Sequence, residues 1–160
     1  MNKFLIMLNL FLRKNGIMRA NYLRRKKIFA HIGENVSYRP FNIPSEPENV
    51  YIGNNVWIAA DVRFITHDLI NRMLFNCVEG YPNLRMHKGR IEIGNNVLIG
   101  AESIILYDKK IGDNVIIAAG SVVTKDVPSF EVWGGNPAKK ICTWDEFVNK
   151  RLIKDKEVNL

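Results

Sequence analysis

Apolar side chains recur at every sixth position over much of the chain. The peptide that begins Ile93-Gly94-Asn95-Asn96 returns three such steps later as Ile111-Gly112-Asp113-Asn114, and an earlier copy begins at Ile52. The sixth-position series runs through Ile52, Ile58 and Phe64, and again through Ile93, Ile99, Ile105, Ile111, Ile117 and Val123. A second series, four positions later, holds Val56, Val62, Val97, Ser103, Val115, Ser121 and Val127, and only Lys109 breaks it. Neither series fits the period of a helix or of a simple alternating strand.

A six-residue step that does not drift predicts a triangular coil. Each unit forms a short strand and a corner, three units close one turn, and successive turns stack at about 4.8 Å. The Gly-Asn-Asn and Gly-Asp-Asn corners suit this arrangement, because these residues tolerate positive φ. The pattern therefore predicts an all-β solenoid of about four or five coils, whose open ends are capped by the terminal helices.

The six-residue phase is lost at two places. The interval from Phe64 to Ile93 is not a multiple of six, which predicts a loop inserted at residues 69–90. The interval from Ile32 to Ile52 exceeds three steps by two positions. Long insertions in solenoids often carry binding function. We expect an N-terminal helical segment over residues 1–30, the coil over 31–133 and a C-terminal turn and helix over 134–160.

The N-terminal segment is rich in apolar and basic residues, and residues 3–29 are predicted to form one or two amphipathic helices. Its apolar run, residues 4–12, is shorter than the ~20 residues of a membrane span, and no small-residue cleavage site precedes Arg13. A signal peptide is therefore not expected. Packing against the body of the protein is the expected fate of this segment, and attachment to an anionic membrane surface is the alternative.

Composition indicates one basic, cytoplasmic folding unit. The 160 residues are 47% hydrophobic and carry a net charge of +7, with much of the excess in residues 24–27 and in the last dozen residues. The charge suits an anionic partner or solvated terminal helices. Nucleic acid is not expected, because no aromatic residues are interleaved with the basic ones. Cys77 and Cys142 form neither a disulfide framework nor a metal-binding pair, which is typical of the reducing cytosol.

Three motifs resemble the hexapeptide-repeat acyltransferases: the repeats, the stretch Ile65-Thr66-His67-Asp68, and the runs at residues 119–128 and 134–139. The resemblance covers roughly residues 31–142. It implies a left-handed parallel β-helix that assembles as a homotrimer with active sites between subunits. Within the family the chain is most similar to the acetyl-CoA-dependent O-acetyltransferases that modify sugars, including those of capsule polysaccharide.

The acceptor side of the implied site centres on His67. Acyl transfer to a hydroxyl needs a base, and an imidazole, with a usual pKa of about 6.5, is suited to this role. His67 also matches the family's catalytic histidine. Asp68 is predicted to orient the imidazole or bind acceptor hydroxyls, with a corner Asx turn as the alternative. His87 in the loop is placed near the acceptor, and the resemblance assigns Asn42 to acceptor binding, with Arg39 as its competitor.

The donor side is marked by small and basic residues. The resemblance places acetyl-CoA in a groove between subunits, along backbone amides of small residues and beside basic residues that meet its phosphates. The matching positions are Gly100, Ala101, Ala118, Ala119, Thr124, Lys125, Lys139 and Lys140. Cys142 stands where related enzymes often have an arginine, which weakens the expected phosphate contacts there.

Two other functions stay open, and one is disfavoured. An N-acetyltransferase of an amino-sugar nucleotide would use the same base and groove, and a non-catalytic solenoid would serve assembly. A zinc site like that of the γ-class carbonic anhydrases is not expected, because His31 precedes the coil and His87 lies in the loop. Outward apolar residues of the later coils predict a face that is buried in the trimer. These residues are Ile104, Leu106, Ile116 and Ala118.

Overall fold

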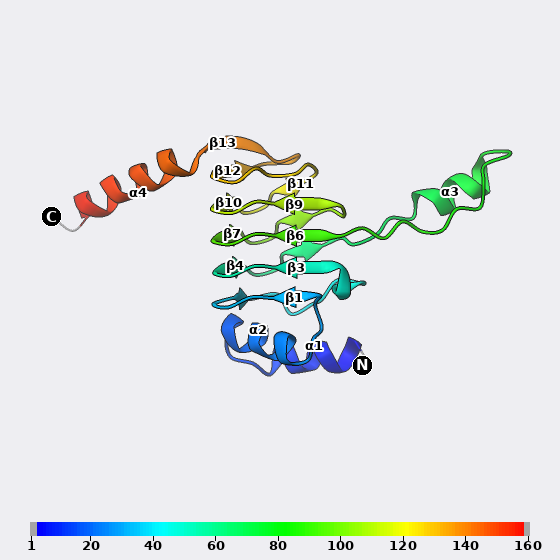
Figure 1. The fold of residues 1–160 in the computed structure, drawn as a ribbon, viewed down its shortest axis with the longest axis horizontal. Coiled ribbons are helices and arrows are strands. Elements are labelled where there is room, and N and C mark those ends of the chain that lie inside the picture. The colour runs from blue at the N-terminus through cyan, green and yellow to red at the C-terminus, as the bar shows by residue number, and fades with distance from the viewer. Residues whose placement is uncertain (1–2, 159–160) are drawn as a thin grey trace.

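The computed structural model describes residues 3–158, and most of its strands stack in parallel coils (Figure 1). The helices are α1 (Lys3–Phe11), α2 (Gly16–Arg25), the short η1 (Pro47–Asn49), α3 (Ile70–Cys77) and α4 (Trp144–Val158). The strands are β1 (His31–Ile32), β2 (Ser37–Tyr38), β3 (Val50–Ile52), β4 (Val56–Ile58), β5 (Arg63–Phe64), β6 (Ile91–Ile93), β7 (Val97–Ile99), β8 (Ile104–Ile105), β9 (Lys109–Ile111), β10 (Val115–Ile117), β11 (Val122–Val123), β12 (Glu131–Gly134) and β13 (Lys139–Thr143).

From β3 to β11, successive strands pass in turn to three different sheets, so the chain winds as a coil. The sheets have the orders β1-β3-β6-β9, β2-β4-β7-β10-β12-β13 and β5-β8-β11. Every pairing is parallel except β12 with β13. Val97 pairs with Val115, which confirms the predicted turn of three six-residue units.

The inward side chains form a continuous apolar column. Ile99, Ile105, Ile111 and Ile117 have no exposed surface, and the small hydroxyl side chains of the second series are buried too. Each fully buried residue of this kind stabilises the fold by about 1.5–3 kcal/mol relative to an exposed one. The six-residue pattern therefore identified the core correctly.

The corners carry ladders of asparagine side chains. Asn55, Asn96 and Asn114 have φ between 52° and 55°, the left-handed conformation expected from the sequence. Asn55 Nδ2 donates to Asn96 Oδ1 at 2.9 Å, and Asn96 Nδ2 donates to Asn114 Oδ1 at 3.0 Å. Each corner thus bonds to the next coil, because the amide is both donor and acceptor.

Both predicted breaks of phase are present. Tyr51 pairs with His31, a step two positions longer than a regular turn. Val56 pairs with Val97, and the chain between them contains the inserted loop. This loop leaves the coil as an arm and includes α3 (Figure 1). The sequence predicted the loop without its helix.

The ends of the coil stack differ (Figure 1). At one end α1 and α2 pack beneath the first coil, and Leu10 and Leu23 have no exposed surface. At the other end the predicted turn contains β13, which returns antiparallel to β12 before α4 begins. The antiparallel strand was not predicted, because residues 139–143 lack the six-residue pattern.

Candidate active site

His67 lies at the neck of the inserted loop, which is the place where the two ends of the loop meet the coil. Its side chain contacts Glu46 from the preceding coil. Its Nδ1 is 2.8 Å from Glu46 Oε2. A β-bridge joins His67 to Lys88, and Gly89 N donates to the Thr66 carbonyl at 2.8 Å, so the two ends of the loop lie together. The imidazole is partly exposed, with 28% of its side-chain surface accessible.

The Glu46 carboxylate is buried and accepts from several donors. Thr66 Oγ1 donates to Oε2 at 2.6 Å, and Lys88 Nζ lies 3.5 Å from Oε1. Burial alone would raise the pKa of Glu46, but the hydrogen bonds from Thr66 and His67 and the charges of His67 and Lys88 outweigh it and hold the pKa below its usual value. The carboxylate is therefore ionised at neutral pH and can only accept hydrogen bonds.

An ionised Glu46 determines the tautomer of neutral His67. Nδ1 must carry the hydrogen that Glu46 accepts, which leaves the lone pair of Nε2 free to take a proton. Sequence reasoning missed Glu46. The twenty-residue interval between the first two coils could have indicated it, because the same interval places Glu46 beside Thr66, the residue before His67.

Asp68 does not contact the ring of His67 through a hydrogen bond. Its Oδ1 accepts from Ile70 N at 3.0 Å, which is the Asx turn considered as the alternative. A hydrogen bond from the Tyr107 hydroxyl and the one from Ile70 N keep the pKa of Asp68 below its usual value.

His87 is brought to the same neck. Its Nε2 lies 2.5 Å from Asp108 Oδ2, and its ring packs edge-on to Tyr107 with centroids 5.1 Å apart. Asp68 N donates to the His87 carbonyl at 3.3 Å. The fold thus gathers Asp68, His87 and the base candidate, together with Tyr107 and Asp108, which sequence reasoning did not single out.

Asn42 is not brought to His67 by a hydrogen bond. Its carbonyl accepts from the Tyr38 hydroxyl at 2.7 Å, and Glu46 is the residue that reaches His67 from the preceding coil. Its competitor Arg39 accepts, through its carbonyl, a bond from Arg19 at 2.7 Å. The roles of Asn42 and Arg39 at the acceptor stay predictions.

The small residues of the donor side stack at one corner of successive coils. A Cβ added to Gly100 would lie 2.4 Å from the backbone N of Ala119, and one added to Gly134 would lie 3.0 Å from the Ala118 Cβ. Gly120 N donates to the Ala101 carbonyl at 2.8 Å. Small residues thus lie against one another in successive coils, which fits the arm of a coenzyme and also fits another subunit.

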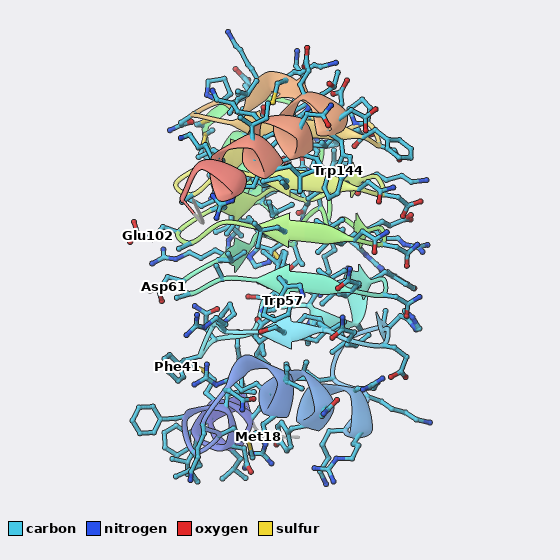
Figure 2. The ribbon with its side chains drawn as sticks, turned by 90° about the vertical axis from the view of Figure 1, so that its left-hand side faces the viewer. Met18, Phe41, Trp57, Asp61, Glu102 and Trp144 are labelled. Atoms are coloured by element: carbon cyan, nitrogen blue, oxygen red, sulfur yellow. The ribbon has the colours of Figure 1, made fainter. Side chains whose placement is uncertain are left out.

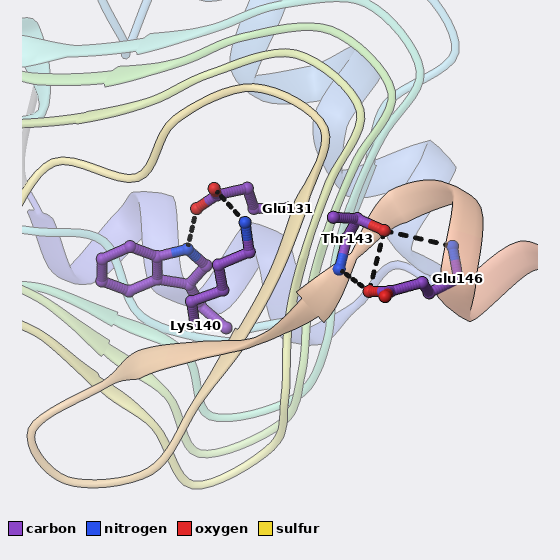
Figure 3. Close-up of polar contacts among 5 residues, drawn as sticks. Glu131, Lys140, Thr143 and Glu146 are labelled. Carbon is purple, nitrogen blue, oxygen red and sulfur yellow. Dashed lines mark hydrogen bonds and ion pairs between the residues drawn. The ribbon is translucent and has the colours of Figure 1, made fainter.

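The lysines of the donor side differ in availability. Lys125 and Lys139 are exposed, whereas Lys140 Nζ lies 2.7 Å from Glu131 Oε1 (Figure 3). This hydrogen bond raises the pKa of Lys140. Glu131 also accepts from the Trp133 indole N–H at 2.7 Å. A phosphate would therefore have to compete with Glu131 for the Lys140 ammonium group.

An apolar strip lies on the outer face of the six-stranded sheet. Trp57 and Leu98 are 47% and 43% exposed, and Ile116 lies on the next strand. With Trp144 these side chains line a hollow of about 540 Å³, and Figure 2 shows Trp57 and Trp144 on this face. The predicted outward residues Ile104, Leu106, Ile116 and Ala118 are half-buried in the single chain.

The repeats of the later coils match a known protein family. Residues 90–125 match the family described as bacterial transferase hexapeptide (six repeats). The chain is 37% identical over 148 residues to the galactoside O-acetyltransferase of Escherichia coli (strain K12), covering 83% of this chain and 73% of that protein. The chain belongs to the bacterial hexapeptide-repeat transferase family. The resemblance inferred from the repeats is thereby confirmed.

Other members of the family are similar over different lengths. The chain is 52% identical over 109 residues to Protein CapG of Staphylococcus aureus, an alignment that covers 68% of this chain and 60% of CapG. The structure of a maltose O-acetyltransferase from Clostridium difficile 630 is 28% identical, with a TM-score of 0.65 over 88% of this chain and 83% of that one. A galactoside acetyltransferase in complex with coenzyme A is 27% identical, with a TM-score of 0.60 over 89% and 78%.

The part of the chain that the structure describes holds neither a metal-binding cluster nor a membrane span. Within residues 3–158 the His, Cys, Asp and Glu side chains form no group of three or more that could hold a metal ion. None of the helices in this same stretch has the length and apolar character needed to cross a membrane.

Proposed function

We propose that the protein transfers an acetyl group from acetyl-CoA to a hydroxyl of a sugar or saccharide precursor, with His67 as the general base. The observation that carries the proposal is the 2.8 Å contact between His67 and the buried Glu46, at the neck of the loop, in a chain of the hexapeptide-repeat transferase family. O-acetylation is favoured over N-acetylation because two relatives that each cover more than four fifths of this chain are named as O-acetyltransferases, one of galactosides and one of maltose.

The reaction follows from the protonation state of the site. His67 Nε2 takes the hydroxyl proton as the acceptor oxygen attacks the thioester carbonyl. The imidazolium that forms is stabilised by the Glu46 carboxylate, whose pKa is already lowered. When the carbon–sulfur bond breaks, the departing thiolate takes the proton back from His67. Ester and free coenzyme A are released, and the enzyme returns to its starting state.

Substrate positions are part of the same proposal. Acetyl-CoA lies along the corner of Gly100, Ala101, Ala118 and Ala119, and the galactoside acetyltransferase structure with coenzyme A supports this donor. Thr124, Lys125 and Lys139 meet its nucleotide and phosphates, and the phosphates compete with Glu131 for Lys140. Asp68 and His87 border the acceptor, because the fold brings both to the neck of the loop.

The proposal includes a left-handed coil, a homotrimer and a cytoplasmic location. The apolar strip of Trp57, Leu98 and Ile116 supports the trimer, since closed symmetry buries the same face in every chain. Each active site then lies between subunits. The free cysteines, Cys77 and Cys142, fit a reducing compartment.

Thiol release from acetyl-CoA, measured with and without a panel of sugars, tests the function. Turnover is expected only with an acceptor, and His67→Ala should reduce kcat by ~10²–10⁴ with little change in acetyl-CoA affinity. His31→Ala is the matched control, because that histidine lies on the first strand and outside the site. Near-normal turnover of His67→Ala would show that His67 is not the general base. Transfer of the acetyl group only to the amino groups of amino sugars would favour an N-acetyltransferase.

A further inference from the structure

The N-terminal helices carry an apolar surface that the body of the protein does not cover. Helix α1 buries Ile6 and Leu10 against the coil. The side chains on its other sides are also apolar, and so are those of the turn and the start of α2. Large apolar side chains that are at least 38% exposed are Phe4, Leu5, Met7, Leu8, Phe11, Leu12, Ile17 and Met18.

This surface lacks the polar groups that a solvated helix face normally presents. Between Lys3 and Arg13 the sole polar side chain is Asn9. Asn9 Nδ2 donates to the Leu5 carbonyl at 2.8 Å, and Arg13 Nη1 donates to Asn9 Oδ1 at 3.2 Å. Both ends of the amide are therefore occupied within the segment. An exposed apolar area of this extent marks a binding surface.

The segment that carries this surface has basic side chains and no acidic ones. Residues 1–33 contain eight lysines and arginines and no aspartate or glutamate. All 16 acidic residues lie in the rest of the chain, where they slightly outnumber the basic ones. The net positive charge of the whole chain thus resides at this end of the coil stack. A second copy docked here would bring two such clusters together, so a partner with negative charge is favoured.

A hollow joins the apolar and basic groups. Its volume is about 970 Å³. Its lining comprises the apolar Leu12 and Met18, the basic Arg13, Arg24 and Arg25, and also Asn21 and Glu34. Arg24 pairs with Glu34. Arginine binds phosphate oxygens through parallel N–H groups, and the adjacent leucine and methionine suit acyl chains.

We propose that the α1–α2 end docks on the surface of an anionic phospholipid bilayer. Helix α1 has nine residues, about 14 Å at 1.5 Å per residue, which is too short for a hydrocarbon core of ~30 Å. It therefore lies in the interface, with its exposed apolar side chains among the acyl chains and the basic residues at the headgroups. The active-site loop leaves the side of the coil and stays accessible (Figure 1).

Flotation of the full chain with vesicles tests this inference. Binding is expected to vesicles of two parts phosphatidylcholine and one part phosphatidylglycerol, and much less to phosphatidylcholine alone. In 1 M NaCl, where the Debye length is about 3 Å, the protein should be released in large part. The variant Leu8→Glu/Leu12→Glu should bind at least roughly tenfold more weakly. Two apolar contacts with the acyl chains are lost, and the two added negative charges are repelled by the anionic headgroups.

The matched control is Leu152→Glu/Ile153→Glu on α4, where the side chains are 53% and 59% exposed, against 44% and 70% for Leu8 and Leu12. It should bind vesicles as the wild type does. All variants should keep their thermal melting and their turnover of soluble acceptor, which separates this inference from the proposed function. If Leu8→Glu/Leu12→Glu does not fold, Arg25→Glu/Lys26→Glu tests the same surface through its charge.

Three results would overturn the proposal. The first is no binding of wild-type protein to the anionic vesicles, and the second is equal binding of the helix variant and the wild type. The third is a larger oligomer of the wild type that Leu8→Glu/Leu12→Glu disrupts, which would make this surface an interface between copies of the chain.

Discussion

Replacing Glu46 by glutamine separates the charge of this residue from its shape. Glutamine keeps an oxygen that can accept from His67 Nδ1, but the negative charge 2.8 Å from the imidazole is removed. The proposed mechanism needs that charge when the imidazolium forms. We therefore expect kcat to fall while the Michaelis constant for acetyl-CoA stays unchanged.

The size of the loss follows from the distance and the burial. Two unit charges 2.8 Å apart interact by about 1.5 kcal/mol in bulk water and by about 6 kcal/mol at an effective dielectric constant of 20. The Glu46 side chain is 9% exposed and that of His67 is 28% exposed, so the pair lies between these limits. A fall in kcat of roughly 10²-fold, within bounds of about 10-fold and 10⁴-fold, is the expected result.

The assay is thiol release at saturating acetyl-CoA and acceptor, with thermal melting measured in parallel. In wild type the Glu46 carboxylate also accepts a hydrogen bond from the Thr66 hydroxyl and pairs with Lys88. Loss of these charge-assisted bonds in Glu46→Gln should lower the free energy of unfolding by about 1.5–3 kcal/mol. Glu48→Gln is the matched control, because that side chain is exposed on the short helix η1, which begins directly after Glu46. A kcat within twofold of wild type in a folded Glu46→Gln would refute the reasoning.

Other predictions concern the donor, the stacking and the assembly. Lys125→Ala and Lys139→Ala should each raise the Michaelis constant for acetyl-CoA about two- to fivefold, and more at low salt than at high salt. Gly100→Ala should lower the free energy of unfolding by about 1–3 kcal/mol, measured by thermal melting, because its Cβ would lie 2.4 Å from the Ala119 backbone. Leu98→Glu should reduce the mass seen by light scattering from about three times 18.4 kDa to a single chain, and turnover should be lost with it, because a charge is then placed in an apolar interface.

Each of these has a control within the chain. Lys140→Ala should change the Michaelis constant less, because Glu131 already pairs with that ammonium. Gly120→Asn should melt like the wild type, since asparagine tolerates its φ of 69° and nothing lies within 4 Å. Lys110→Glu, on the four-stranded sheet, should leave the mass unchanged. A fully active monomer of the wild type would contradict both the shared interface and the shared site.

Several features were predictable because they are local and repeated. The six-residue step needs only an inward side chain and a corner that accepts positive φ, and each copy of the motif repeats both requirements. Ile93 and Ile111 are therefore recognisable without any knowledge of the neighbouring coil. His67 was predicted from its corner position after the inward Phe64 together with its match to the family's catalytic histidine, and its role as the base stays a prediction.

The partners of these residues depend on how the coils stack. Glu46 contacts His67 from the preceding coil, and Asp108 contacts His87 from the following one. The irregular corners of these coils set the register between them. A change of one residue in such a corner would move a different side chain beside the imidazole. Asn42 was the candidate that the family resemblance suggested on the preceding coil, and its role at the acceptor stays a prediction. The residue that the packed coils place against the His67 ring is Glu46.

The coil, its core and its corners could be predicted from the chain alone, because backbone pairing between similar turns demands the same residue types every six positions. The apolar and basic residues of 3–29 likewise predicted one or two amphipathic helices, and the structure has α1 and α2 there. The folded molecule was needed to show that two apolar side chains of α1 face the coil while the rest stay uncovered, and that the buried carboxylate of Glu46 contacts His67. Both outcomes depend on which surfaces meet, and that is a property of the packed molecule rather than of any one segment.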